Sequence, residues 1–238
     1  MTPTETTSAA DPSMPPGGIA RLKESVKRLA YAVLDPLVAL LGRIGVGPDA
    51  LTTIGCVFSV FSGVAFFEGG FRLGSALLLA SGICDMLDGQ VARRQNQVSR
   101  FGAFLDSTLD RFAEAFVLIG IAGFYLVNLV DLVHDPTRAL TEMGRGLEPR
   151  TWAVISLTAM MALVGSFMVS YTRARAEGLG LDGKVGWFER PERLLLVMIA
   201  GAFGVGPVMP GALLLLTIFS FGTVAQRVAH VWKQTRSS

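Results

Sequence analysis

Residues 85–110 read DMLDGQVARRQNQVSRFGAFLDSTLD. Four aspartates stand within or at the edge of apolar segments in this stretch: Asp85, Asp88, Asp106 and Asp110. Each ionised side chain near the centre of a membrane helix costs roughly 2.5–3.5 kcal/mol. Four such costs in one stretch indicate that something offsets them, and a bound cation would do so.

The spacing of the aspartates favours a metal site. On helices, Asp85 and Asp88 share one face, and Asp106 and Asp110 share another. Two facing helices would gather the four carboxylates around one point, and oxygen ligands suit a hard cation such as Mg²⁺ or Mn²⁺. We therefore predict a site formed by all four carboxylates, which is enough for two ions.

The residues between the two pairs favour a phosphate ligand. Gly89, Ala92 and Gly102 keep one side nearly free of side chains, so that a ligand or a neighbouring backbone can approach closely. Arg93 lies two turns beyond Asp85 and supplies a planar cation suited to phosphate oxygens. Together these residues predict a site for a diphosphate ester.

The pattern D-x2-D-G-x2-A-R-x8-G-x3-D-x3-D resembles that of the CDP-alcohol phosphatidyltransferase family, with every fixed position present. The resemblance is densest over residues 48–111 and reappears near 173–193. It implies that the chain transfers a phosphatidyl group from CDP-diacylglycerol to a polar alcohol in phospholipid biosynthesis, releasing CMP. It also implies that Asp110 acts as the general base, with the other three aspartates as metal ligands.

The resemblance extends to the binding of the CDP-lipid. Residues 48–52 read PDALT and are similar to the family's Pro-Asn-x-Leu-Thr entry to its first span, where Asp49 replaces the usual Asn and adds charge near the nucleotide. Ser99 stands where similar enzymes place a hydroxyl that contacts the nucleotide. The expected CDP-lipid site therefore consists of Pro48, Asp49, Ala50, Leu51, Gly89, Ala92, Arg93, Ser99 and Gly102.

Basic residues near the acidic site predict the second substrate. Arg173, Arg193 and Arg227, with Lys233 as a further candidate, would form a cationic cup that suits a phosphorylated polyol better than a neutral alcohol. Alternatively, these residues merely enforce membrane topology. Residues 173–177 (RARAE) and 189–193 (ERPER) resemble the phosphatidylinositol phosphate synthase branch, which implies inositol phosphate as the acceptor.

Other acceptors stay open at this point. Residues 51–55 lack the arginine that typically follows Leu-Thr in the glycerol-phosphate enzymes, which favours inositol phosphate. Glycerol 3-phosphate, serine, inositol or another alcohol are alternatives, as is a different donor lipid. A divalent-cation transporter would also use intramembrane carboxylates, but it needs them through the depth of the membrane. A scaffold has no need of metal-ligand spacing.

Composition favours a membrane protein. The 238 residues are 51% hydrophobic and 17% charged, with a mean hydropathy of +0.50, whereas soluble domains average about 25% charged residues. The two cysteines lie in apolar segments and form no disulfide framework. The net charge of +2 is small, and we expect no nucleic-acid partner.

The chain divides into three predicted parts. Residues 1–18 have the composition of a disordered tail, and residues 19–47 interleave basic and apolar residues like an amphipathic juxtamembrane helix. Residues 48–233 contain six apolar stretches, at 50–68, 71–92, 102–130, 151–174, 191–206 and 208–230. We therefore predict an all-α integral membrane protein with six transmembrane helices and an N-terminal amphipathic juxtamembrane helix.

The distribution of basic residues predicts the orientation. All but four of the 21 lysine and arginine residues fall on one side of the six spans, so both termini and the acidic site are expected in the cytoplasm of a multi-pass cell-membrane protein. Residues 131–150 would form an outer loop without recognisable chemistry. The family resemblance implies a homodimer, for which the apolar third and fourth spans would supply a face.

Overall fold

The computed structural model describes residues 33–144, 148–186 and 188–236, and the chain forms two compact units, residues 1–45 and 46–238. In the first unit, residues 33–43 are helical. The predicted tail at 1–18 and the first part of the amphipathic segment, up to residue 32, lie outside the described residues.

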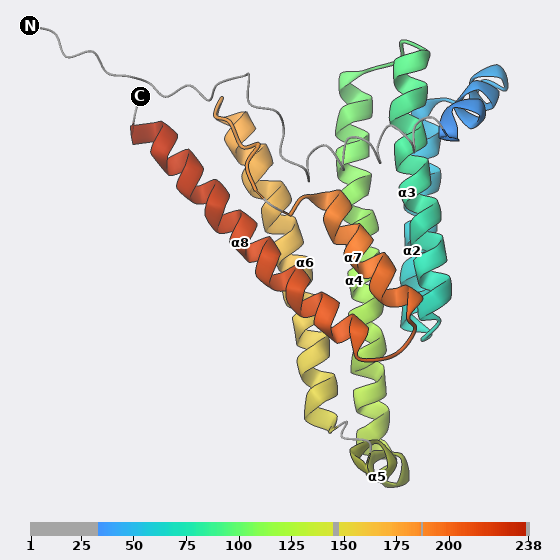
Figure 1. The fold of residues 1–238 in the computed structure, drawn as a ribbon, viewed down its shortest axis with the longest axis vertical. Coiled ribbons are helices and arrows are strands. Elements are labelled where there is room, and N and C mark those ends of the chain that lie inside the picture. The colour runs from blue at the N-terminus through green and yellow to red at the C-terminus, as the bar shows by residue number, and fades with distance from the viewer. Residues whose placement is uncertain (1–32, 145–147, 187, 237–238) are drawn as a thin grey trace, which may run out of the picture. The chain divides into compact units, whose positions relative to one another are not determined.

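In the described part of the second unit, all regular secondary structure is helical (Figure 1). Its helices, in chain order, are α2 (Pro48–Phe67), α3 (Phe71–Arg94), α4 (Arg100–His134), α5 (Pro136–Gly144), α6 (Pro149–Gly178), α7 (Arg190–Ala202) and α8 (Val208–Arg236). Six of these helices coincide with the six predicted apolar stretches. The additional helix, α5, lies in the segment that we predicted as an outer loop.

Four of the described helices, α2, α4, α6 and α8, are long and apolar enough to cross a membrane. Helix α3 is 24 residues long but carries charged residues near both of its ends. Helix α7 has 13 residues and is therefore roughly 20 Å long, shorter than the ~30 Å hydrocarbon core of a bilayer. The count of six spans stays a prediction.

The helices pack as a bundle in which α4 is central. Helix α2 packs against α3 and α4, α6 packs against α4 and α8, and α7 packs mainly against α3 and α8. Helices α2 and α4 come into close contact at Gly63 and Gly120, where a Cβ on Gly120 would overlap the backbone of Gly63. Small residues let helix backbones come into contact in this way.

The turn between α3 and α4 brings the two acidic helix ends together. Helix α3 ends at Arg94 and α4 begins at Arg100, so both ends lie at the same end of the bundle. Asn96 adopts a positive φ of 55° in this turn, a conformation that asparagine tolerates better than most residues. The Oγ of Ser99 accepts a hydrogen bond of 2.8 Å from the backbone N–H of Gly102 and so caps α4.

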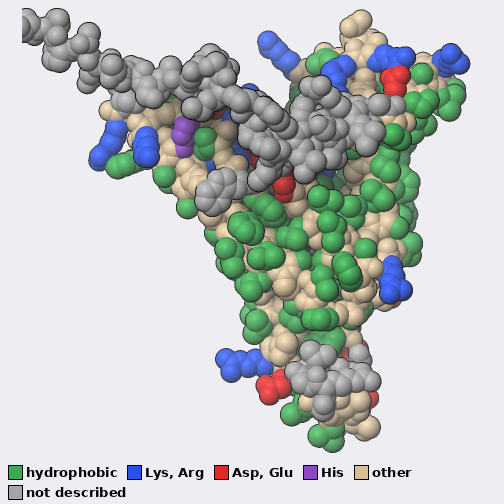
Figure 2. Space-filling model, viewed as in Figure 1, with side chains coloured by type: hydrophobic (Ala, Val, Ile, Leu, Met, Phe, Trp, Pro, Cys, Tyr) green, Lys and Arg blue, Asp and Glu red, His purple; other side chains and the backbone are tan. Residues whose placement is uncertain are grey.

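The outer surface of the helices is largely apolar. Hydrophobic side chains cover the middle of the face shown in Figure 2, over α4, α6, α7 and α8. Many large apolar side chains are exposed, including Phe112 and Ile119 on α4 and Leu157 and Val164 on α6. An apolar outer surface of this extent is what helices that face lipid require.

Candidate active site

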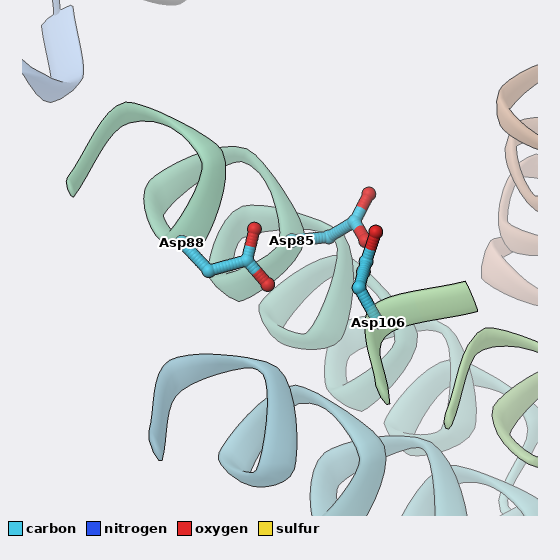
Figure 3. Close-up of side chains that lie close together, drawn as sticks. All are labelled: Asp85, Asp88 and Asp106. Carbon is cyan, nitrogen blue, oxygen red and sulfur yellow. The ribbon is translucent and has the colours of Figure 1, made fainter. Parts of the chain in front are cut away.

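Three aspartates from two helices converge at one point. Asp85 and Asp88 extend from α3 and Asp106 extends from α4, and their side chains point toward one another (Figure 3). Each residue offers a carboxylate oxygen, and these oxygens all lie within 4.8 Å of one another. Asp88 is buried, with 7% of its surface exposed. The expectation that facing helices gather these acids holds for these three residues.

The donor set of this group fits a hard divalent cation. All three ligands are carboxylates, the type that Mg²⁺ and Mn²⁺ prefer. Oδ1 of Asp106 is buried and has no hydrogen-bond partner among the described residues, and an unpaired buried carboxylate oxygen is costly unless a cation satisfies it. Thr52 Oγ1 donates a hydrogen bond of 2.7 Å to Asp88 Oδ2 and so orients that carboxylate.

Asp110 lies beside this group and is bound by an arginine. Arg190 Nη2 lies 2.8 Å from Asp110 Oδ1, and Arg190 Nη1 lies 2.9 Å from Asp85 Oδ1. One guanidinium on α7 therefore bridges an aspartate on α3 and an aspartate on α4. Asp110 also lines a small cavity together with Asp85, Asp88 and Arg190. It is therefore adjacent to the candidate metal-binding group of Asp85, Asp88 and Asp106, although it is not a member of that group.

A larger cavity of about 350 Å³ opens next to the aspartates. Its lining includes seven of the nine residues predicted for the CDP-lipid: Pro48, Asp49, Gly89, Ala92, Arg93, Ser99 and Gly102. Of the other two, Ala50 is exposed and Leu51 is buried, and neither lines the cavity. Asp88 and Asp106 form part of the wall, so a ligand in this cavity would touch two of the three candidate metal ligands.

The cavity wall is closely packed around Gly102. A Cβ on Gly102 would lie 3.0 Å from Ser99 Oγ and 3.2 Å from Asp49 Oδ1, both shorter than ordinary contacts. Glycine therefore leaves room there for the N-cap and for the acidic side chain at position 49. The hydroxyl of Ser99, which we predicted as a nucleotide contact, caps α4 and lines the same cavity.

Two arginines of the predicted cationic cup, Arg193 and Arg227, are buried and hydrogen-bonded to other parts of the protein. Arg193 is 1% exposed and donates two hydrogen bonds to Glu114 on α4, of 2.7 Å from Nε and 2.9 Å from Nη2. Arg227 is 2% exposed and donates to the carbonyl oxygens of Val185 and Val169. Both guanidinium groups are therefore buried and already bound to protein oxygens.

Arg173 is more accessible than Arg193 or Arg227. Its side chain is 40% exposed and pairs with Glu177 at 3.0 Å. Arg173 and Arg227 each come within 3.9 Å of Glu189, the residue immediately before Arg190. Arg173 and Arg227 therefore lie close to Arg190 at the start of α7.

Three contributors to the site were missed in the sequence. Thr52 belongs to the quoted PDALT segment but was not assigned to the site. Arg190 was considered only as part of the ERPER segment and of the basic residues that predict topology. Glu114 was not considered, although a lone acid in an apolar segment one turn after Asp110 requires a partner. The position of Glu114 within an apolar stretch was the signal that it needs a cationic partner, which the structure shows to be Arg193.

Comparisons with known proteins show the family to which the chain belongs. Residues 46–223 match the family model of the CDP-alcohol phosphatidyltransferases. The chain is 33% identical over 206 residues to an archaetidylinositol phosphate synthase of Methanothermobacter thermautotrophicus, covering 85% of this chain and 90% of the relative. It is 32% identical over 238 residues to a phosphatidylinositol phosphate synthase of Streptomyces avermitilis, covering 95% and 88%.

Solved structures of a phosphatidylinositol phosphate synthase from Mycobacterium tuberculosis share the fold. The complex with manganese and citrate has a TM-score of 0.67 at 30% identity, covering 83% of this chain and 88% of that one. The structure with CDP-DAG bound has a TM-score of 0.66 at 31% identity, covering 83% and 92%. With a family model that matches most of its length and relatives of this similarity, the chain belongs to the CDP-alcohol phosphatidyltransferase family.

Proposed function

We propose that the chain transfers the phosphatidyl group of CDP-diacylglycerol to inositol phosphate and releases CMP. The observation that supports this proposal most strongly is that the group of Asp85, Asp88 and Asp106 adjoins the 350 Å³ cavity, with Asp88 and Asp106 in the cavity wall. Arg190 is paired with the third member of the group, Asp85. The relatives described above are synthases of inositol phosphate lipids, which supports this acceptor over glycerol 3-phosphate.

The proposed donor site is the cavity lined by Pro48, Asp49, Arg93 and their neighbours. Arg93 would pair with a phosphate oxygen, and Gly89 and Gly102 would leave room for the diphosphate. Asp85, Asp88 and Asp106 would hold the divalent cation, with Asp110 as the fourth carboxylate. When bound, the cation neutralises the diphosphate and stabilises the charge that develops on the departing CMP.

For the attack step we assign the proton transfer to Asp110. The acceptor hydroxyl would lose its proton to this carboxylate while its oxygen forms a bond to the phosphorus that bears the diacylglycerol. The bond between that phosphorus and the bridging oxygen of CMP would break, so that CMP leaves with the electron pair. Positioning and electrostatics account for most of the catalysis in reactions of this type.

For the acceptor phosphate we propose Arg173 and Arg190. Arg190 touches Asp110, so a phosphate held by its guanidinium would bring the acceptor next to the proposed base. Arg173 approaches the same helix start through Glu189. The side chains of Arg193 and Arg227 are only 1% and 3% exposed, whereas that of Arg190 is 20% exposed. We therefore assign Arg193 and Arg227 to the support of this site rather than to the phosphate itself.

The test of the proposed function is an acceptor panel with purified protein. CMP release is measured with CDP-diacylglycerol and, in separate reactions, inositol phosphate, inositol, glycerol 3-phosphate and serine, each with Mg²⁺, with Mn²⁺ and with a chelator. We expect metal-dependent release with inositol phosphate well above the other acceptors. Release with glycerol 3-phosphate that equals or exceeds it would overturn the acceptor, and release in the presence of chelator would overturn the metal requirement. A parallel panel with a CDP-activated ether lipid tests the donor.

Three further features belong to the proposal. We propose Mg²⁺ or Mn²⁺ as the cation and two ions in the complete site, since Asp110 lines a cavity with Asp85 and Asp88 and lies one helical turn after Asp106. We place the site and both termini on the cytoplasmic side of the cell membrane, as the basic residues favour. We also propose a homodimer that pairs the exposed apolar faces of α4 and α6, which the mass of the detergent-solubilised protein by light scattering would test.

A further inference from the structure

Two arginines link α7 to α4 in successive turns. Arg190 and Arg193 lie three residues apart on α7, and Asp110 and Glu114 lie four residues apart on α4, so each pair shares one face of its helix. Arg190 pairs with Asp110 at 2.8 Å and Arg193 pairs with Glu114 at 2.7 Å. The two ion pairs form a ladder between the helices.

The two rungs differ in burial. The side chains of Arg193 and Glu114 are 1% and 4% exposed, whereas those of Arg190 and Asp110 are 20% and 15% exposed and border the acidic site. Because an unpaired buried charge is strongly unfavourable, the inner pair stays closed. Its two N–H···O bonds, from Nε and Nη2 to the two carboxylate oxygens, constrain the direction as well as the distance.

The way α7 packs explains why the ion pair of Arg193 and Glu114 matters for the position of α7. Helix α7 packs mainly on α3 and α8, and Glu189 provides no side-chain cap at its start. On the side that faces α4, Arg190 and Arg193 reach across from α7 and form ion pairs with Asp110 and Glu114. Arg193 is one turn away and is fixed there by Glu114.

We propose that Glu114 and Arg193 are a positioning pair, whose buried ion pair sets the register of α7 on α4 so that Arg190 reaches Asp110 and Asp85. The inference deepens the proposed function and rests on it for the acceptor. Both members of the pair are buried, and we assign neither of them a contact with the substrates. Their effect on the reaction passes through Arg190.

The test replaces both charges at once. In E114M/R193M, apolar side chains of similar length fill the space without leaving a buried charge, and such replacements are often neutral for stability. We expect a Tm close to that of the wild type and an unchanged KM for CDP-diacylglycerol. For the acceptor, kcat/KM should fall by about 100-fold, the cost of a misplaced group near the reaction. A folded variant with wild-type kinetics would overturn the proposal.

A double-mutant cycle shows whether the effect passes through Arg190. The readout is Mn²⁺ affinity by electron paramagnetic resonance, which needs no acceptor and so reports on the pair even if the acceptor panel fails. R190Q removes a cation next to Asp85 and should raise Mn²⁺ affinity. E114M/R193M should raise it too, with no further rise when it is added to R190Q. An equal, additive effect in both backgrounds would contradict a role through Arg190.

Two further variants complete the design. R193K keeps both buried charges paired but loses the bidentate geometry, so it should fold and show smaller changes in Mn²⁺ affinity and in kcat/KM for the acceptor. If the double variant does not fold, a folded R193K that equals the wild type in both measurements would overturn the proposal. The matched control is S156A, which removes a buried hydrogen bond between α6 and the Ala122 carbonyl of α4. It should leave Mn²⁺ affinity and both KM values unchanged.

Discussion

Thr52 and Thr53 are neighbours on α2 with different roles at the site. Thr52 donates to Asp88 at 2.7 Å, whereas Thr53 donates to the backbone oxygen of Asp49 at 2.8 Å. Partners that orient a metal ligand typically contribute about 10–100-fold to metal affinity. Thr52→Val should therefore weaken Mn²⁺ binding by roughly tenfold or more, as measured by a spectroscopic titration.

Thr53→Val is the matched control for that prediction. It makes the same change of hydroxyl to methyl one residue along the helix and removes a bond that does not involve an aspartate side chain. Its Mn²⁺ affinity should equal that of the wild type. Equal losses in the two variants would mean that the hydroxyl of Thr52 acts through helix stability and not through Asp88.

Asp110 is the residue on which the proposed proton transfer depends. Asp110→Asn keeps the shape of the side chain but removes the basic oxygen, so CMP release should fall by about 10²–10⁴-fold, the usual contribution of a general base. Binding of CDP-diacylglycerol, measured separately by equilibrium binding, should change little, since Asp110 does not line the larger cavity. Turnover close to that of the wild type would rule out the assigned role.

The aspartates could be predicted from the sequence, but the arginines could not. The aspartates stand at three- and four-residue spacings on helices, and such spacing alone places them on common faces. Arg190 and Arg193 both occur in the ERPER segment and are equally plausible from the sequence. Which of them reaches the acidic site depends on the rotation of α7, and that rotation depends on contacts with Glu114, 79 residues away in the chain.

At the scale of elements, the close contact between α2 and α4 supports the site. A Cβ on Gly120 would overlap the backbone of Gly63, and a Cβ on Gly63 would overlap the carbonyl of Phe116. Gly120→Ala should therefore lower the stability by about 1–3 kcal/mol, as overpacked cores do, and this loss should appear as a lower Tm in detergent.

The control for that change lies on α3. A Cβ on Gly82 would meet nothing within 4 Å, and alanine favours a helix over glycine by about 0.5–1 kcal/mol. Gly82→Ala should therefore be neutral or slightly stabilising. A Gly120→Ala variant as stable as the wild type would show that the two helices separate easily, and the site would then need another support.

Hydropathy predicted the helices of the structure except for one additional helix, α5, and the end of α7. Apolar runs predicted six helices near their observed bounds, because a helix in lipid must satisfy its own backbone. The helix α5 was missed because residues 136–144 are too polar and short to give a membrane signal. The fifth stretch was expected over 191–206, but α7 ends at Ala202, and Gly204 then adopts a positive φ of 82°.

At the scale of the whole molecule, the orientation in the membrane is open to direct measurement. With Cys56 and Cys84 replaced by alanine, single cysteines are introduced at Thr141 on α5 and Thr235 near the end of α8. An impermeant maleimide should label Thr141→Cys in intact cells and Thr235→Cys only after permeabilisation, because basic residues favour the cytoplasmic side. The opposite pattern of labelling would invert the topology.

The central claim is that Asp85, Asp88 and Asp106 hold a divalent cation at the meeting point of α3 and α4. The most direct measurement is a Mn²⁺ titration by electron paramagnetic resonance of the wild type, of the three single Asp→Asn variants and of D131N, at the far end of α4, as the control. The account predicts saturable binding that each of the three variants weakens at least about tenfold, as loss of a charged ligand requires, with D131N unchanged. Mn²⁺ affinity that survives intact in D106N would contradict it.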